Sequence, residues 1–101
     1  MRIITKRRLT DFSKKHADAK GSLLAWHKNT STATWQNLVE LKETFPSADL
    51  VSNFTVFNIG GNKYRLIVYI DYEDGIVFIR HILTHAEYDK DDWKDDDWYG
   101  S

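Results

Sequence analysis

The chain has 101 residues, of which 42% are hydrophobic, 14% are aromatic and none is cysteine, and its formal net charge is −1. This length and composition predict one domain with one modest core, and they exclude a disordered chain, disulfides and thiolate metal sites. No apolar run approaches the ~20 residues that span a bilayer, and the charged start Met1–Arg8 lacks the apolar core of a secretory signal, so we expect a cytoplasmic protein.

The first half of the chain predicts one strand and then helices. Leu9 and Phe12 have the spacing of one helical face, and Trp26 and Trp35 lie on apolar stripes that we assign to the core. Pro46 ends the last of these helices, because the residue before a proline disfavours helical geometry. The elements expected here are a strand at 2–5 and helices near 9–16, 23–27 and 35–45.

The second half of the chain predicts strands joined by tight turns. Gly60-Gly61-Asn62 and Glu73-Asp74-Gly75 are turn signals, and strands joined so tightly must be antiparallel. Alternation along the last strand predicts Arg80 on one face and His81 on the other, with Val77 and Ile79. Thr84 and Glu87 form a capping-box pattern that begins a short helix over 85–92. The strands expected here are 54–59, 63–71 and 76–83.

These elements predict an α+β fold. An antiparallel sheet of three to four strands is expected, with the N-terminal helices on one face and a short C-terminal helix. The charge is uneven, because residues 87–101 carry seven acidic and two basic side chains, net −5, whereas residues 1–86 carry net +4. We assign residues 1–90 to the domain and expect residues 91–101 to be a flexible acidic tail containing Trp93 and Trp98.

One end of the predicted sheet gathers groups that suit RNA chemistry. Pairing around the turn at 73–75 brings residues 63–65 beside residues 83–85, so Lys63, Arg65, His85 and Tyr88 should cluster. Arginine binds two phosphate oxygens at once, histidine moves protons near neutral pH, and tyrosine donates a proton or stacks on a base. RNA carries its own nucleophile, the 2′-hydroxyl, so such a site needs no metal.

Plainer interpretations of the same residues stay open. Arg65 can pair with a surface carboxylate, and His81 is more simply a packed, hydrogen-bonded residue than a catalyst. His85 can decorate a helix start, and Tyr88 can pack as a hydrophobic staple. A metal site from His81, His85 and Asp89 is a weak alternative, because a strand-to-helix change separates the two histidines.

Two blocks of sequence together resemble a known family. They are Phe57-Asn-Ile-Gly-Gly-Asn62 followed by Arg65, and Thr84-His-Ala-Glu-Tyr-Asp89. The chain resembles the HigB-type toxins of the RelE superfamily from its start to about Lys90. The resemblance implies a RelE-like, microbial-RNase-type fold and a bacterial toxin of a type II toxin–antitoxin system.

The resemblance also implies an activity, partners and site residues. Such toxins are ribosome-dependent mRNA endonucleases without a metal cofactor, and a HigA-type helix-turn-helix antitoxin binds operator DNA together with the toxin. The implied roles are Arg65 as phosphate and transition-state ligand and His85 and Tyr88 as proton-transfer or substrate-orienting groups. Lys63 and Arg80 are implied as RNA or ribosome contacts.

Two further expectations concern charge. The basic start, Lys6, Arg7 and Arg8, is our candidate RNA-docking surface, with a solvated helix face as the alternative. The acidic tail departs from the basic surface that is usual for such toxins, and a tail folded over the site would compete with RNA for its cations. The alternative functions are a non-catalytic RNA- or protein-binding module on the same scaffold and a metal-dependent nuclease.

Overall fold

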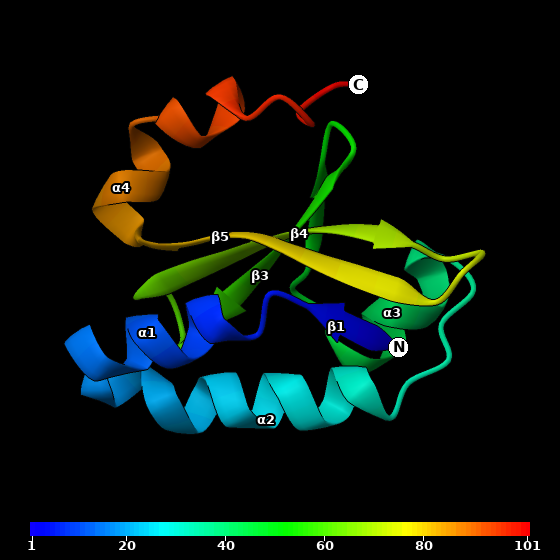
Figure 1. Cartoon of the computed structure of the whole chain (residues 1–101), viewed down its shortest axis with the longest axis horizontal. Helices are drawn as coiled ribbons and strands as arrows, with labels where there is room; N and C mark the ends of the chain where they lie inside the picture. Colours follow the sequence, from blue (N-terminus) through cyan, green and yellow to red (C-terminus); the bar gives the residue numbers. More distant parts are fainter.

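The computed structural model describes residues 1–101 and builds them around one five-stranded sheet (Figure 1). The strands are β1 (Arg2–Ile4), β2 (Asp49–Val51), β3 (Phe54–Ile59), β4 (Tyr64–Asp71) and β5 (Ile76–Thr84). Their order across the sheet is β1-β5-β4-β3-β2, and every neighbouring pair is antiparallel except β1 and β5. The α+β class is confirmed. The sheet differs from the expected three to four antiparallel strands in two ways: the edge strand β2 was not predicted, and β1 pairs with β5 in parallel.

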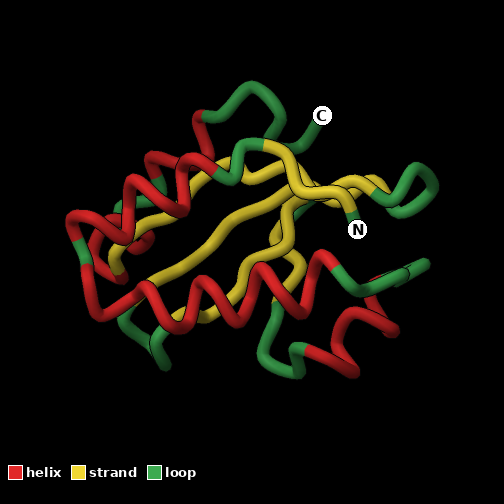
Figure 2. The backbone as a smooth tube through the Cα atoms, turned by 60° about the horizontal axis from the view of Figure 1, so that its bottom comes forward, coloured by secondary structure: helices red, strands yellow, loops and turns green.

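The helices cover one face of this sheet and its ends. They are α1 (Arg7–Lys15), α2 (Lys20–Ser31), α3 (Leu38–Thr44) and α4 (His85–Asp89), with short 3-10 turns η1 (Ala17–Ala19) and η2 (Asp92–Asp95). Figure 2 shows α1 and α2 lying together across the strands. Asn37 begins α3 by accepting a hydrogen bond from the Glu40 amide, and Pro46 follows its end as expected.

The main core lies between the N-terminal helices and the sheet. Leu9 of α1 and Trp26 of α2 are 4% and 2% exposed, and they pack with Phe57 and Leu66 from the sheet. The Trp26 ring meets Phe57 edge-on at 5.5 Å between centroids. Trp35 is also buried, so the prediction that both tryptophans belong to the core is confirmed. None of the helices combines the length and the apolarity needed to cross a membrane.

The hairpin register agrees with the pairing inferred from the turns. Arg65 of β4 lies opposite Leu83 of β5, and Tyr64 lies opposite Thr84. The capping box at the start of α4 is also present: the Glu87 amide donates to Thr84 Oγ1, and the Thr84 amide donates to Glu87 Oε1. The end of β5 and the start of α4 are therefore held beside the start of β4.

A β-bulge interrupts strict alternation in β5. Val68 pairs with Ile79 and Ile67 pairs with His81, so Arg80 is an extra residue without a partner on β4. A bulge of this kind turns two successive side chains toward the same face. The expectation that His81 shares a face with Val77 and Ile79 was therefore wrong, because Arg80 and His81 both reach the face that the helices leave open.

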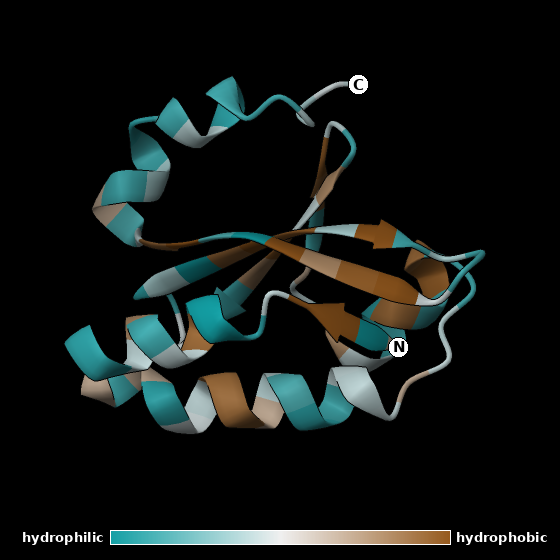
Figure 3. Cartoon of the chain, viewed as in Figure 1, coloured by the Kyte–Doolittle hydropathy of each residue, from teal (hydrophilic) through white to brown (hydrophobic).

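The C-terminal segment lies on this open face instead of extending into solvent. Trp93 is only 4% exposed and packs in a second, smaller cluster with Phe54, Val56 and Ile67 of the sheet. In Figure 3 this segment carries mostly hydrophilic colours. The structure packs residues 91–101 on the sheet, because aromatic side chains spaced along the acidic tract reach β3 and β4; the expected flexibility of this segment stays a prediction.

Candidate active site

A main-chain hydrogen bond joins the start of α4 to the residue that precedes the start of β4. The His85 amide donates to the Lys63 carbonyl oxygen over 2.9 Å, and the capping box fixes the first turn of the helix. Tyr88 follows His85 by three residues and so lies one helical turn along on a neighbouring surface position. Residues from β4 and α4 are thus brought to one end of the sheet.

Arg65 and Tyr88 lie together in this region. The Arg65 guanidinium carbon is 5.6 Å from the centroid of the Tyr88 ring, within the range of a cation–π contact. The guanidinium donates only to main-chain carbonyl oxygens, those of Asn62 and Tyr64, each over 3.2 Å. Arg65 forms no ion pair with a carboxylate, so its charge is available to an anionic ligand.

The Tyr88 ring is held by the C-terminal segment. It stacks on Trp93 with centroids 5.2 Å apart and planes inclined by 12°, and the Trp93 indole N–H donates to the Tyr88 carbonyl oxygen. Burial raises the pKa of the Tyr88 phenol, although the nearby Arg65 charge acts in the opposite direction. The phenol therefore keeps its proton at neutral pH and acts as a donor.

His85 is more exposed and faces a different partner. Its Nε2 lies 3.6 Å from Asp89 Oδ1, one turn later on α4, and half of its side-chain surface is open to solvent. A carboxylate at this distance can orient an imidazole. The structure therefore brings Arg65 to Tyr88, and it places the His85 ring beside Asp89 at the helix start.

Lys63 turns away from this cluster. Its ammonium pairs with Asp18 over 3.2 Å, and Tyr64 donates to the same carboxylate over 2.6 Å. The hydrogen bond from Tyr64, followed by that from Lys63, lowers the pKa of Asp18. Because both ends of the Lys63–Asp18 pair are largely exposed, it contributes little stability and exchanges readily with other partners.

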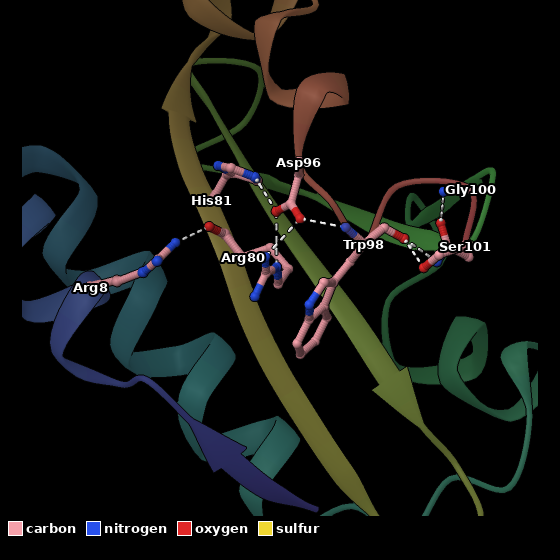
Figure 4. Close-up of polar contacts among 8 residues, drawn as sticks. Arg8, Arg80, His81, Asp96, Trp98, Gly100 and Ser101 are labelled. Atoms are coloured by element: carbon pink, nitrogen blue, oxygen red, sulfur yellow. Dashed lines mark hydrogen bonds and ion pairs between the residues drawn. The ribbon is translucent and has the colours of Figure 1, made fainter.

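The bulge residues Arg80 and His81 form a second polar cluster, and the sequence analysis missed their partner. Arg80 donates twice to Asp96, over 2.9 and 2.7 Å, and His81 Nε2 lies 2.8 Å from the same carboxylate (Figure 4). Burial lowers the pKa of His81 and outweighs the opposite effect of Asp96. The only sequence signal for Asp96 was the tryptophan spacing around it, because acidic residues in a charged tract look alike.

The three basic residues of the chain start do not share one surface. Arg8 donates to the Arg80 carbonyl oxygen and lines a hollow of about 320 Å³ between α1 and β5. Lys6 lines a separate groove of about 490 Å³ between α1 and α2, and Arg7 points to solvent near Asp11. Only Arg8 therefore approaches the open face of the sheet through β5.

The candidate metal ligands do not converge. His81 faces Asp96, whereas His85 faces Asp89. No group of three or more His, Cys, Asp or Glu side chains is placed to hold a metal ion together.

Comparison with known proteins identifies the family. The family model HigB_toxin, described as a RelE-like toxic component of a toxin–antitoxin system, matches residues 19–91, well over half of the chain. The chain belongs to the HigB toxin family. A relative named mRNA interferase toxin HigB, from Escherichia coli strain K12, is 33% identical over 92 residues, which cover 88% of each chain. The mRNA interferase HigB of Escherichia coli O6:H1 is 29% identical over 93 residues, covering 89% of this chain and 90% of the relative.

Some features of this HigB toxin lie within the residues that the family model matches, and others lie beyond them. Arg65, His85 and Tyr88 all lie within the matched residues. The match ends before Trp93 and Asp96, so the contacts of the C-terminal segment belong to this chain and not to the family description. The resemblance inferred from the two sequence blocks is confirmed, whereas the roles of individual residues stay predictions.

Proposed function

We propose that this HigB toxin is an mRNA endonuclease that cleaves translated messages on the ribosome, by attack of the ribose 2′-hydroxyl and without a metal ion. The observation that carries the proposal is Arg65, which has no carboxylate partner and lies beside the Tyr88 phenol, with His85 one helical turn away. The names of the relatives, which are mRNA interferases, support the same activity.

The proposed reaction uses only groups of the chain and the RNA. Arg65 binds the oxygens of the scissile phosphate and stabilises the charge that grows on them. His85 accepts the proton of the 2′-hydroxyl as the general base. The new bond from the 2′-oxygen to phosphorus forms as the bond to the 5′-oxygen breaks, and the Tyr88 phenol protonates that leaving oxygen. The products are a 2′,3′-cyclic phosphate and a 5′-hydroxyl end.

In this proposal, the other basic side chains predicted from the sequence bind RNA outside the cleavage site. Lys63 directly precedes β4 and Arg80 lies on β5. With Lys63 released from Asp18, the two cations would contact neighbouring phosphates or ribosomal RNA. Lys6, Arg7 and Arg8 would contribute attraction that does not depend on sequence. Because they lie on separate surfaces, we expect each to add a modest part of the affinity.

The proposed partners follow from the toxin–antitoxin family. We infer a HigA-type helix-turn-helix antitoxin that neutralises the toxin in the bacterial cytoplasm, and contact with operator DNA only through that complex. A gene for a small helix-turn-helix protein beside this one, with co-purification of the two products, would support this partner.

The decisive experiment compares induced wild-type protein with Arg65→Ala, His85→Ala and the control Lys42→Ala on α3. We expect wild type and the control to arrest translation and to cut messages in the presence of translating ribosomes, also in chelator. Loss of transition-state stabilisation or proton transfer should slow cleavage by roughly 10²-fold or more in the two site variants. Full toxicity of both site variants would remove the assignment.

The same assay separates the alternatives. Binding of RNA with strong salt dependence but no cleaved product would favour a non-catalytic module on this scaffold. Loss of cleavage in chelator would favour a metal-dependent nuclease. Equal cleavage with and without ribosomes would contradict ribosome dependence while leaving the endonuclease activity in place.

A further inference from the structure

The C-terminal strap, which we define as residues 91–101, crosses the face of the sheet that carries the candidate active site. It contains five aspartates and one lysine, net charge −4. Figure 1 shows it on the side of the sheet opposite α1 and α2, beyond α4. A strongly acidic segment on this face is unexpected in a protein that binds a polyanion, because it repels the ligand.

The polar contacts between the strap and β5 all come from one carboxylate, that of Asp96. The Asp96 side chain is 3% exposed and binds the Arg80 guanidinium with both oxygens, in the parallel geometry by which arginine also binds phosphate. His81 Nε2 and the Trp98 amide complete the site, each 2.8 Å from a carboxylate oxygen. The bulge in β5 creates this pair of neighbouring donors, since regular alternation would turn them apart.

Two parts of the strap are held in different ways. Trp93 is buried in the second cluster, next to Phe54 and Tyr88. Beyond Asp95, the Asp96 carboxylate binds Arg80 and His81, and the Trp98 ring lies 3.8 Å from the Arg80 guanidinium carbon (Figure 4). Trp98 and Tyr99 are only partly buried: Trp98 packs against Tyr69 and Phe78, and Tyr99 packs against Phe54. Asn53 adds hydrogen bonds of 2.7 Å with Trp98 and Gly100. Lifting residues 96–101 would break these contacts, whereas the Trp93 ring would keep its contacts with Phe54 and Tyr88.

We propose that Arg80 and His81 form a phosphate-binding subsite for RNA, and that Asp96 of the strap occupies this subsite until RNA displaces it. The two carboxylate oxygens of Asp96 take the positions that two phosphate oxygens of a bound strand would take. This inference rests on the proposed function, because it assigns the same face of the sheet to RNA.

An anion, and not a proton, must open the strap. Burial alone would raise the pKa of Asp96, but the hydrogen bonds from Arg80, the Trp98 amide and His81 lower it to about 2. The carboxylate therefore stays charged at every physiological pH. A tethered competitor acts at an effective concentration of the order of millimolar, so the strap weakens binding of short free RNA and yields to a polyanion that makes many contacts at once.

The first test measures binding of a 2′-O-methylated single-stranded RNA oligonucleotide, which the protein cannot cleave, over a range of salt concentrations. Asp96→Asn removes the competing charge, and Asp97→Asn removes an equal charge from an exposed residue without contact to Arg80. We expect about tenfold tighter binding for Asp96→Asn and a change below about twofold for Asp97→Asn. The dependence of log affinity on log salt should steepen by about 0.7 for the phosphate that Arg80 gains.

A second variant removes the competing residue and keeps the buried part of the strap. A chain ending at residue 95 lacks Asp96 and retains Trp93, which packs against Phe54 and Tyr88. We expect this chain to bind the oligonucleotide several-fold more tightly than the full chain. Arg80→Ala added to Asp96→Asn should abolish the gain in affinity.

Four results would overturn the proposal. The first two are equal binding of the full chain and the chain ending at residue 95, and no difference between Asp96→Asn and Asp97→Asn. The third is weaker binding of a folded Asp96→Asn, which would mean that Asp96 orients Arg80 for RNA. The fourth is absence of binding by every variant. A failure of the proposed function is distinguishable, because unmodified RNA would then stay uncut on ribosomes while the binding gain of Asp96→Asn persists.

Discussion

Asp96 shows how much a single residue depends on where the chain places it. Its neighbours Asp95 and Asp97 are exposed, whereas its own carboxylate is enclosed by Arg80, His81 and the Trp98 amide. A buried carboxylate without these partners would be destabilising. With them, the charged form is favoured so strongly that the pKa falls from 3.8 to about 2. A pKa that folding lowers makes stability depend on pH.

We predict that Asp96→Asn lowers the free energy of unfolding at pH 7 by about 2 kcal/mol, the value that this pKa shift represents. The stabilisation by Asp96 is fully present above about pH 4 and is lost as the pH falls through the folded-state pKa of about 2. Denaturant unfolding from pH 7 to pH 2 should therefore show the wild-type and Asp96→Asn curves converging at low pH. Asp97→Asn should follow wild type throughout, and a constant gap between wild type and Asp96→Asn would contradict the argument.

At the scale of elements, patterns within one element or one hairpin could be predicted from sequence. The turn at 73–75 set the pairing of Arg65 with Leu83, and the spacing of Thr84 and Glu87 gave the cap of α4. Pairings between distant segments could not be predicted. The parallel contact of β1 with β5 joins residues more than seventy positions apart, and no local signal marks it.

The bulge at Arg80 was missed for a similar physical reason. Its sequence alternates as a regular strand would, and the extra residue is visible only when β4 is paired beside it. The docking of the strap was missed because its charge predicts solvation, whereas Trp93 and Trp98 supply the apolar surface that holds it. The candidate catalytic residues were predicted from strand pairing and from the family resemblance, whereas the carboxylate that faces Arg80 was not predicted.

The capping box fixes the orientation of the first turn of α4. This helix has five residues, too few to be stable without a cap or tertiary contacts. We predict that Thr84→Ala costs about 1 kcal/mol of stability and reduces RNA cleavage by more than that loss explains, because His85 and Tyr88 lose their fixed helical turn. Thr84→Ser, which keeps the hydroxyl acceptor, should retain both stability and activity. Parallel measurements of chemical unfolding and of cleavage rate test this, and unchanged cleavage by a folded Thr84→Ala would refute it.

At the scale of the whole molecule, the sheet has two apolar faces and needs two covers. α1 and α2 cover one face, and the strap covers part of the other, so the molecule has a main core and a smaller second cluster. In our proposal the strap has two roles. Trp93 buries the second cluster, whereas the segment from Asp96 onward occupies the proposed RNA subsite.

This division predicts different consequences for two truncations. A chain ending at residue 90 loses Trp93 and uncovers Phe54, Val56 and Ile67. We expect it to lose about 3–5 kcal/mol of stability, as for removal of a buried tryptophan side chain, and to self-associate through the exposed patch. A chain ending at residue 95 keeps Trp93 and should stay folded and monomeric. Urea unfolding measures the stability of both truncations, and size-exclusion chromatography measures their self-association. If the chain ending at residue 90 were as stable as the full chain, the fold would not require the strap.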